Sequence, residues 1–238
     1  MMSIDFAKRS VEIELMDDLD CQGALINQTL RELDVINRLL GGNAITVKGV
    51  NQLLDNDSSK RPYSIADIGC GSGEMLRLIA RQAERKGKQV ALTGIDANPH
   101  IIGYAKENTT SYPHIEFRSM NIFSEEFRQM EFDLVLATLF LHHFTDEQLV
   151  ALFRQLKNQT TVGIIVNDLH RHPLAYYSFK LISTLFSKSK MIKHDGLISV
   201  LRGFKKKELQ AVLHKASITN YSLTWRWAFR WKLVIYTS

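Results

Sequence analysis

The sequence predicts an α/β protein with a doubly wound, mostly parallel sheet. Residues 65–68 form a short apolar run that passes through three alternate glycines into apolar residues at helical spacing, which indicates strand, tight turn and helix. A second strand, at 89–95, ends in an acid and is followed by a helix start. Residues 132–139 are almost entirely apolar, as expected of a strand that helices cover on both faces.

The glycine turn predicts a ligand site. Gly69, Gly71 and Gly73 remove every Cβ from one side of the turn, so the backbone can take positive φ and a ligand can lie against the main chain. In a dinucleotide-binding turn the third glycine stands at the position of Glu74, whose carboxylate would repel a diphosphate at the helix N-terminus. Asp67, inside the strand, is likewise poorly placed for a diphosphate. We therefore expect a ligand without phosphates.

Asp96 ends the second predicted strand, and Asn98 and Pro99 then supply a helix N-cap with proline at the first helical position. Asp96 lies 23 residues beyond Gly73, close to the roughly 20-residue offset at which an acid reaches ribose hydroxyls in dinucleotide folds. Its carboxylate can accept both hydroxyl protons of a ribose. The alternative is an acid that merely opens a helix.

The stretch from 65 to 76 resembles the first motif of the class I (Rossmann-like) S-adenosylmethionine-dependent methyltransferases, whose usual form is hydrophobic-x-Asp-hydrophobic-Gly-Cys/Thr-Gly-x-Gly. The resemblance implies a methyltransferase that uses S-adenosylmethionine and releases S-adenosylhomocysteine. It also implies a seven-stranded sheet with an antiparallel last strand next to the fifth. The residues that it places at the cofactor are Asp67, Gly69, Cys70, Gly71, Gly73, Asp96, Ala97, Asn121, Ile122 and Thr138.

Asn121 departs mildly from the family pattern. Methyltransferases of this type usually have an Asp at this position, where it accepts a hydrogen bond from the adenine amino group. An amide carbonyl can also accept that bond, although without the help of a charge.

The remaining segments divide the chain into two expected parts. Residues 1–60 read as an N-terminal helical cap, with one helix that stops at Gly41-Gly42, a second at 47–54, and a linker over 56–62. In the family such helices commonly lie over the cofactor; patching the edge of the core is the alternative. The methyltransferase domain is expected over 61–238, with a helical lid insertion after strand 5 at about 170–204.

The domain's other elements follow the same reasoning. A capping box from Thr145 to Gln148 opens a helix, and Phe204 is expected to begin the last one. The predicted strands not yet described are 114–120, 161–168, and a terminal hairpin of 218–225 and 229–236.

Histidines follow the fourth and fifth strands, whose carboxyl ends are where open parallel sheets bind ligands. Methyl transfer from a sulfonium is an in-line displacement that needs alignment, and a hydroxyl acceptor also needs a base, for which His is suited. We expect His143 and His170 to be catalytic, although the family often has Leu-His-His here and the pair could instead close the adenine pocket. The expected substrate-pocket residues are His142, His172, Tyr176, Tyr177 and His194.

The acceptor is expected to be a small, aromatic, quinone- or polyketide-like molecule that is methylated on O or C. The aromatic-rich segment 174–186 and the resemblance to small-molecule methyltransferases favour it. Methylation of protein or RNA and a noncatalytic cofactor-binding subunit remain alternatives. A nicotinamide oxidoreductase would share Asp96, but Glu74 argues against it.

Charge is distributed unevenly along the chain. Residues 170–238 hold nine lysines and four arginines against Asp195 and Glu208, a net +11, which leaves −6 for the rest. Such a region favours an anionic partner, such as a carrier or a lipid surface, although a solvated face is an equal alternative. Nucleic acid is not the expected partner.

Cysteine usage and hydropathy suggest the compartment. Cys21 and Cys70 are far apart and give neither a disulfide framework nor a metal-ligand spacing, so we expect no metal and a reducing compartment. No apolar run is long enough to span a bilayer, and the first residues lack a secretory pattern. We therefore expect a cytoplasmic enzyme.

Overall fold

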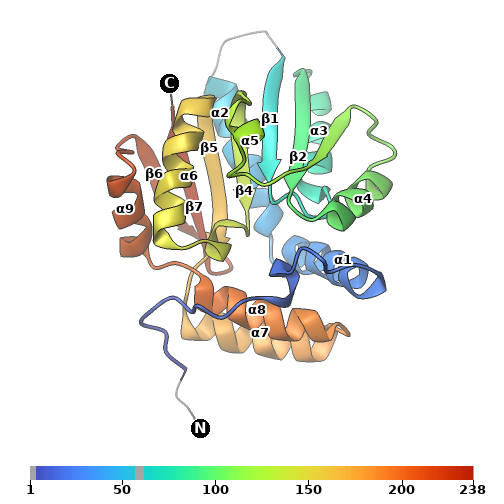
Figure 1. Cartoon of the computed structure of the whole chain (residues 1–238), viewed down its shortest axis with the longest axis vertical. Coiled ribbons are helices and arrows are strands. Elements are labelled where there is room, and N and C mark those ends of the chain that lie inside the picture. Colours follow the sequence, from blue (N-terminus) through green and yellow to red (C-terminus); the bar gives the residue numbers. More distant parts are fainter. Residues whose placement is uncertain (1–3, 57–61, 238) are drawn as a thin grey trace.

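The strands form one twisted sheet with helices on both faces. The computed structural model describes residues 4–56 and 62–237, and within these ranges seven strands pair in the order β3-β2-β1-β4-β5-β7-β6 (Figure 1). All neighbouring strands run parallel except β7, which is antiparallel to both β5 and β6. The strands are β1 Tyr63–Ile68, β2 Val90–Asp96, β3 Ile115–Ser119, β4 Phe132–Thr138, β5 Thr160–Leu169, β6 Tyr221–Arg226 and β7 Arg230–Tyr236. This confirms the predicted fold class.

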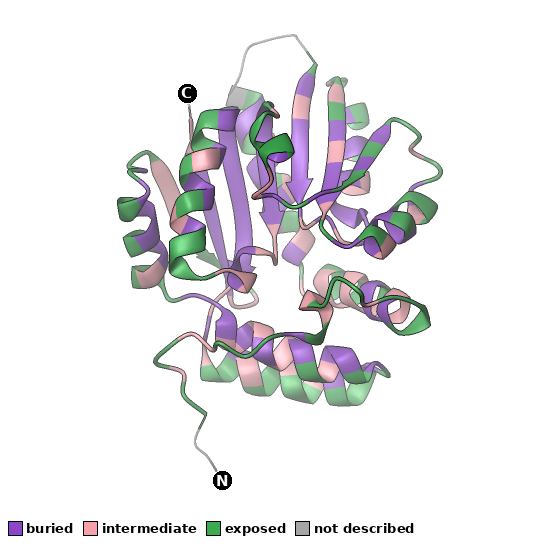
Figure 2. Ribbon diagram, viewed as in Figure 1, coloured by how far each residue is buried: buried purple, intermediate pink, exposed green. Residues whose placement is uncertain are grey.

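Two apolar cores hold the layers together, one on each face of the sheet. On one face α2 (Gly42–Asn56), α3 (Glu74–Arg85) and α4 (Pro99–Asn108) bury their apolar side chains. On the other face α5 (Glu125–Arg128), α6 (Asp146–Gln159) and α9 (Lys206–Lys215) do the same (Figure 2). The strands between them are buried on both sides, which explains the near-continuous apolar run at β4.

Helix starts follow the local sequence. The Asn98 side chain accepts from the backbone of His100 and Ile101 at the head of α4, with Pro99 at the first helical position. The predicted capping box between Thr145 and Gln148 is present at α6.

Two predicted helix starts were wrong. The second N-terminal helix starts at Gly42, well before residue 47, and most of the predicted linker (57–61) lies outside the described residues. The last helix starts at Lys206, because Phe204 is fully buried and bridges to His170. The helix at 190–202 lies within the predicted helical insertion, but its own bounds had not been predicted, since buried polar residues such as Asp195 and Arg202 interrupt its apolar pattern.

A layer of helices lies across the carboxyl edge of the sheet. It consists of α1 (Ala24–Leu39), α7 (Pro173–Phe186) and α8 (Lys190–Arg202), together with the N-terminal segment 4–23, and we call it the cap (Figure 1). Within it α7 packs on α8, and α8 packs on α1. None of the helices in the described ranges has the length and apolar character needed to cross a bilayer.

Polar contacts fasten the cap to the glycine turn. The Ser72 hydroxyl lies 2.7 and 2.8 Å from the two Asp34 carboxylate oxygens on α1. The Glu74 carboxylate pairs with Arg38 at 2.7 Å and accepts from Asn43 at 3.0 Å. The acid that begins α3 is therefore a tether between the cap and the sheet.

The Asp34 carboxyl, which contacts Ser72 of the glycine turn, makes the stability of the protein depend on pH. Burial, together with the nearby charge of Glu74, raises the pKa of Asp34 to about 6, against the hydrogen bond from Ser72. The folded protein keeps a proton on Asp34 that the unfolded chain releases near pH 4, so stability falls as pH rises from about 4 to 6 and stays lower above it. In urea unfolding, the free energy of unfolding of Asp34→Asn should change by about 2 kcal/mol less over this pH range than that of the wild type.

The exposed Asp20→Asn variant serves as the control and should unfold with the wild-type pH dependence. Equal pH dependence in Asp34→Asn and wild type would show that the buried carboxyl does not titrate in this range.

Candidate active site

A large cavity lies between the cap and the carboxyl ends of the central strands. Its volume is about 1140 Å³, and it reaches from the glycine turn to the segment after β4. Ligand pockets for one small molecule are typically about 300–1,000 Å³. The space is therefore sufficient for a cofactor and an acceptor side by side.

The three turn positions require glycine for different reasons. Their φ angles are all positive, at 68° for Gly69, 51° for Gly71 and 75° for Gly73. A Cβ on Gly69 would lie 2.2 Å from the Phe140 ring, and one on Gly73 would lie 2.9 Å from Phe117. The expectation that all three clear space for a ligand is thus corrected, because protein side chains fill the space at Gly69 and Gly73, whereas a Cβ on Gly71 would meet only Leu30, at 3.8 Å.

Two carboxylates border this turn, of which Asp67 is buried and Asp96 is partly buried. Asp96 accepts from the Asn98 amide at 3.0 Å and from the Gly71 amide at 3.4 Å, and burial raises its pKa. Asp67 Oδ1 has no hydrogen-bond partner among the described residues, and burial, together with the charge of Asp96, raises its pKa well above the usual range. A ligand that brings hydrogen-bond donors would relieve this unsatisfied oxygen.

The other predicted cofactor residues largely converge on the same cavity. Asn121 Oδ1 already accepts from the Phe123 amide at 2.9 Å, and the Thr138 hydroxyl lies 3.0 Å from that of Thr46. Gly73 is absent from the cavity wall. The predicted residues that line it are Asp67, Gly69, Cys70, Gly71, Asp96, Ala97, Asn121, Ile122 and Thr138.

Beyond β4, a short 3₁₀ turn (η2, Leu141–His143) brings two histidines to the cavity. His142 is buried, and its Nδ1 lies 2.7 Å from Asp168 Oδ1 near the end of β5. Asp168 also accepts from the Leu141 amide at 2.8 Å. Burial opposes ionisation of Asp168, yet the His142 ring and backbone donors hold its pKa below the usual range.

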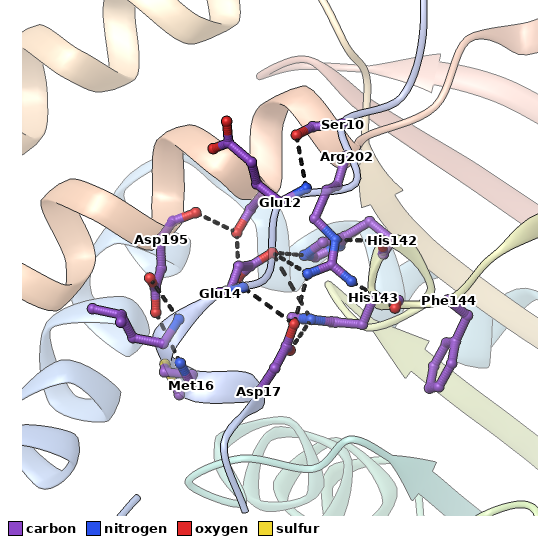
Figure 3. A network of polar contacts seen from close by, with 12 residues as sticks. Ser10, Glu12, Glu14, Met16, Asp17, His142, His143, Phe144, Asp195 and Arg202 are labelled. Atoms are coloured by element: carbon purple, nitrogen blue, oxygen red, sulfur yellow. Dashed lines mark hydrogen bonds and ion pairs between the residues drawn. The ribbon is translucent and has the colours of Figure 1, made fainter.

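His143 pairs with an acid from the N-terminal segment. Its Nδ1 lies 2.6 Å from Asp17 Oδ1 on η1 (Leu15–Asp17), and its side chain is 22% exposed (Figure 3). Arg202 from α8 approaches the other Asp17 oxygen to 2.6 Å. Burial opposes the ionisation of Asp17, but His143 and Arg202 lower the pKa of its carboxyl.

Glu14 lies at the centre of this cluster. It is buried, its Oε2 accepts from the Ser199 hydroxyl at 2.7 Å, and its Oε1 lies 3.6 Å from His142 Nε2 and 3.8 Å from His143 Nδ1 (Figure 3). Burial is the main reason that its pKa is raised to about 6.

Sequence reasoning missed four residues of this cluster. Glu14 and Asp17 come from a segment without periodicity, and Asp168 and Arg202 are brought to the histidines by β5 and α8. Only the position of Asp168 at a strand end could have suggested a role.

Several predicted site residues lie elsewhere. Of the predicted catalytic and pocket residues, the cavity is lined by His142, His143 and Tyr177. His170 follows the end of β5 and accepts from the Trp225 indole at 3.2 Å, and it is not among the residues that line the cavity.

The other three predicted pocket residues make local contacts outside the cavity wall. His172 caps α7 by accepting from the Leu174 amide at 3.1 Å. Tyr176 packs against Phe6. His194 is exposed and lies 2.8 Å from Asp195.

Comparison with known proteins agrees with this architecture. The model of a family described as "Methyltransferase domain" matches residues 65–163. The chain is 30% identical over 96 residues to the ubiquinone/menaquinone biosynthesis C-methyltransferase UbiE of Campylobacter jejuni, a match that covers 39% of this chain and 40% of that protein. It is 31% identical over 94 residues to the malonyl-[acyl-carrier protein] O-methyltransferase of Acetivibrio thermocellus, covering 40% and 31%. These matches span well under two thirds of either relative.

Solved structures share the fold. The plantazolicin methyltransferase BpumL in complex with SAH superposes with a TM-score of 0.65 at 18% identity, covering 89% of this chain and 94% of that one. The CurJ carbon methyltransferase gives 0.63 at 13% identity, covering 82% and 54%. Residues 65–163 thus match the model of the methyltransferase domain family, and the chain has the class I, Rossmann-like fold of the S-adenosylmethionine-dependent methyltransferases.

Proposed function

We propose that the protein transfers the methyl group of S-adenosylmethionine to a small, largely apolar acceptor in the cavity. The observation that carries this is the placement of Asp96 and Gly71 at one part of the cavity and the His142–His143 pair at another. Asp96 would accept from the ribose hydroxyls, the cofactor would lie against the backbone at Gly71, where a Cβ would meet only Leu30, and Asn121 and Ile122 would border the adenine. The neighbours crystallised with SAH or SAM support this choice of cofactor.

Methyl transfer from S-adenosylmethionine requires mainly that the protein align the acceptor with the methyl group. The bound cofactor supplies an activated methyl group on a sulfonium, and its thioether leaves as a neutral group. The cavity wall excludes water and orients the acceptor. For a hydroxyl acceptor, the histidine cluster would remove the proton, with the carboxylates of Asp17 and Asp168 holding the two rings in place.

The cavity's walls favour an apolar acceptor such as a quinone- or polyketide-like ring. Large apolar side chains from the sheet edge and from the cap line it, among them Leu33, Ile36, Phe140, Phe144, Ile182 and Trp227. The relatives named for quinone biosynthesis and for a malonyl carrier support both C- and O-methylation.

Labelled methyl transfer tests the proposed function. Purified protein, labelled S-adenosylmethionine and an extract of the cells that make the protein should yield label in the organic-soluble fraction. Label in protein or RNA alone would favour the macromolecular alternative. Binding of the cofactor without any transfer would favour a noncatalytic subunit.

The basic C-terminal third is less uniform than the sequence suggested. Four of its thirteen cationic residues are buried inside the protein: Arg171, Arg202, Arg230 and Lys232. The exposed lysines include Lys188 and Lys190 at the start of α8 and a group at 205–207 after it. The 13 residues of α8 separate the two groups by about 20 Å, more than twice the screening length of about 8 Å in physiological salt.

We expect Lys188 and Lys190 to attract an anionic carrier or lipid surface that delivers the acceptor. They follow α7, whose outer face exposes Leu181, Leu185 and Phe186 (Figure 2). The double variant Lys188→Gln/Lys190→Gln should raise the apparent KM several-fold and weaken its salt dependence, with an unchanged rate at saturation. The matched Lys205→Gln/Lys206→Gln variant should change neither. Equal effects of both pairs would indicate general charge rather than a local docking surface.

A further inference from the structure

We propose that Glu14, His142 and His143 bind a divalent transition-metal ion, zinc by the nature of the ligands. Each side chain presents one ligand atom, and these atoms all lie within 4.8 Å of one another. The role of the ion toward an acceptor rests on the proposed function, whereas binding of the ion does not.

The spacing suits tetrahedral coordination. Bonds of 2.0–2.1 Å at a tetrahedral zinc ion place neighbouring ligand atoms about 3.3–3.4 Å apart. Glu14 Oε1 lies 3.6 Å from His142 Nε2 and 3.8 Å from His143 Nδ1, so shifts of a few tenths of an ångström bring both pairs to that spacing.

One ligand atom makes no hydrogen bond. Glu14 is 5% exposed, and its Oε1 makes no hydrogen bond to any described residue, while its Oε2 is fixed by Ser199. Buried polar atoms are rarely left without a hydrogen bond, and a bound ion is one of the usual reasons. The oxygen lies between the two imidazole nitrogens that would share the ion (Figure 3).

The surroundings orient the ligands. Asp168 Oδ1 binds His142 Nδ1 at 2.7 Å, which leaves Nε2 as the metal ligand, and such a carboxylate behind a metal-binding histidine is the usual arrangement. Arg202 donates to the His142 and His143 carbonyls at 3.1 and 2.6 Å, and Arg9 donates to the His142 carbonyl at 2.9 Å. The turn that carries both histidines is therefore held from outside.

The charges around the cluster also favour a divalent cation. Three carboxylates face it, from Glu14, Asp17 and Asp168, whereas Arg202 is the guanidinium nearest to them, 3.7 Å from Glu14 Oε1. The charge of Arg9 is matched by Asp146 at 2.9 Å.

The proposed ion would reach the reaction site. Glu14, Asp17, His142 and His143 all line the cavity, so an acceptor oxygen could join or replace one ligand, as in zinc sites that keep a position for substrate. The expectation of no metal came from the cysteines. The histidines and acids of this site come instead from two remote segments, and nothing in their sequence spacing reveals it.

Titration calorimetry on chelator-treated protein tests the proposal directly. Zinc should bind with a stoichiometry of one per chain and a micromolar or tighter Kd, and cobalt(II) should give the visible absorption of a four-coordinate site. Glu14→Gln and His142→Ala should each weaken zinc binding at least tenfold. The exposed controls Glu12→Gln and His214→Gln should bind as wild type.

Absence of zinc and cobalt binding in the wild-type protein would overturn the proposal, and so would unchanged affinity in Glu14→Gln. Circular dichroism and affinity for S-adenosylhomocysteine, measured on the same samples, show whether each variant is folded. Binding of S-adenosylhomocysteine without binding of zinc would refute the metal site and leave the proposed function intact. Binding of zinc without binding of S-adenosylhomocysteine would refute the proposed function and leave the metal site intact.

Discussion

Replacing Asp96 with alanine should raise the Kd for S-adenosylhomocysteine at least 100-fold in calorimetry. Asp96 is partly buried beside Gly71, and without its carboxylate two ribose hydroxyls would lose their acceptor. Hydrogen bonds to a charged group contribute about 1.5–3 kcal/mol each, and each 1.4 kcal/mol is a factor of ten.

The control for this variant is Asp55→Ala. Asp55 is exposed at the end of α2 and pairs with Lys86, outside the cavity. It should bind the ligand as wild type. Unchanged affinity in Asp96→Ala would remove Asp96 from the site.

His143→Gln should keep its affinity for S-adenosylhomocysteine and lose about 10² to 10⁴ in methyl-transfer rate. The size of the loss is that of a positioned proton-transfer group, and either a histidine base or a metal ligand at this position would produce it. The partial exposure of His143 in the cavity and its contact with Asp17 motivate the choice. The measurement is labelled methyl transfer to the organic-soluble fraction of the cell extract.

His214→Gln is the matched control, because His214 is exposed on α9 and lies away from the cavity wall. Full activity in His143→Gln, with unchanged cofactor affinity, would indicate that the acceptor needs no proton removed and that the enzyme acts through alignment alone.

The parts of the fold that could be predicted are those written in local patterns. Strand, glycine turn and helix around Gly71 are signalled by consecutive residues, and so are the capped starts of α4 and α6. The buried central strands are recognisable because helices cover both of their faces. These local patterns locate the carboxyl ends of the central strands, and therefore also the position of Asp96 at the end of β2.

The acid–histidine cluster could not be predicted, for a physical reason. Asp17 and His143 are far apart in the sequence and come into contact only when the cap has folded onto the sheet. The segment that carries Glu14 has neither helical nor strand periodicity. His170 shows the converse error. Its position after β5 suggested the cavity, but the backbone there bridges to Phe204 and its ring turns to Trp225.

Glu74 was interpreted from its repulsion of a diphosphate, and the structure gives it a second role. Its carboxylate holds Arg38 of the cap and Asn43 of α2. The residue therefore links the position of the cap to the ligand turn, which the sequence of the turn alone cannot show.

A crystal structure with S-adenosylhomocysteine tests the central claim most directly, because it shows where the cofactor lies in the cavity. The ribose hydroxyls should lie within hydrogen-bonding distance of Asp96, the chain should pass over Gly71, and the sulfur should face His142 and His143. A ligand bound elsewhere, or bound here with its sulfur turned away from the histidines, would contradict the proposed methyl transfer at this site.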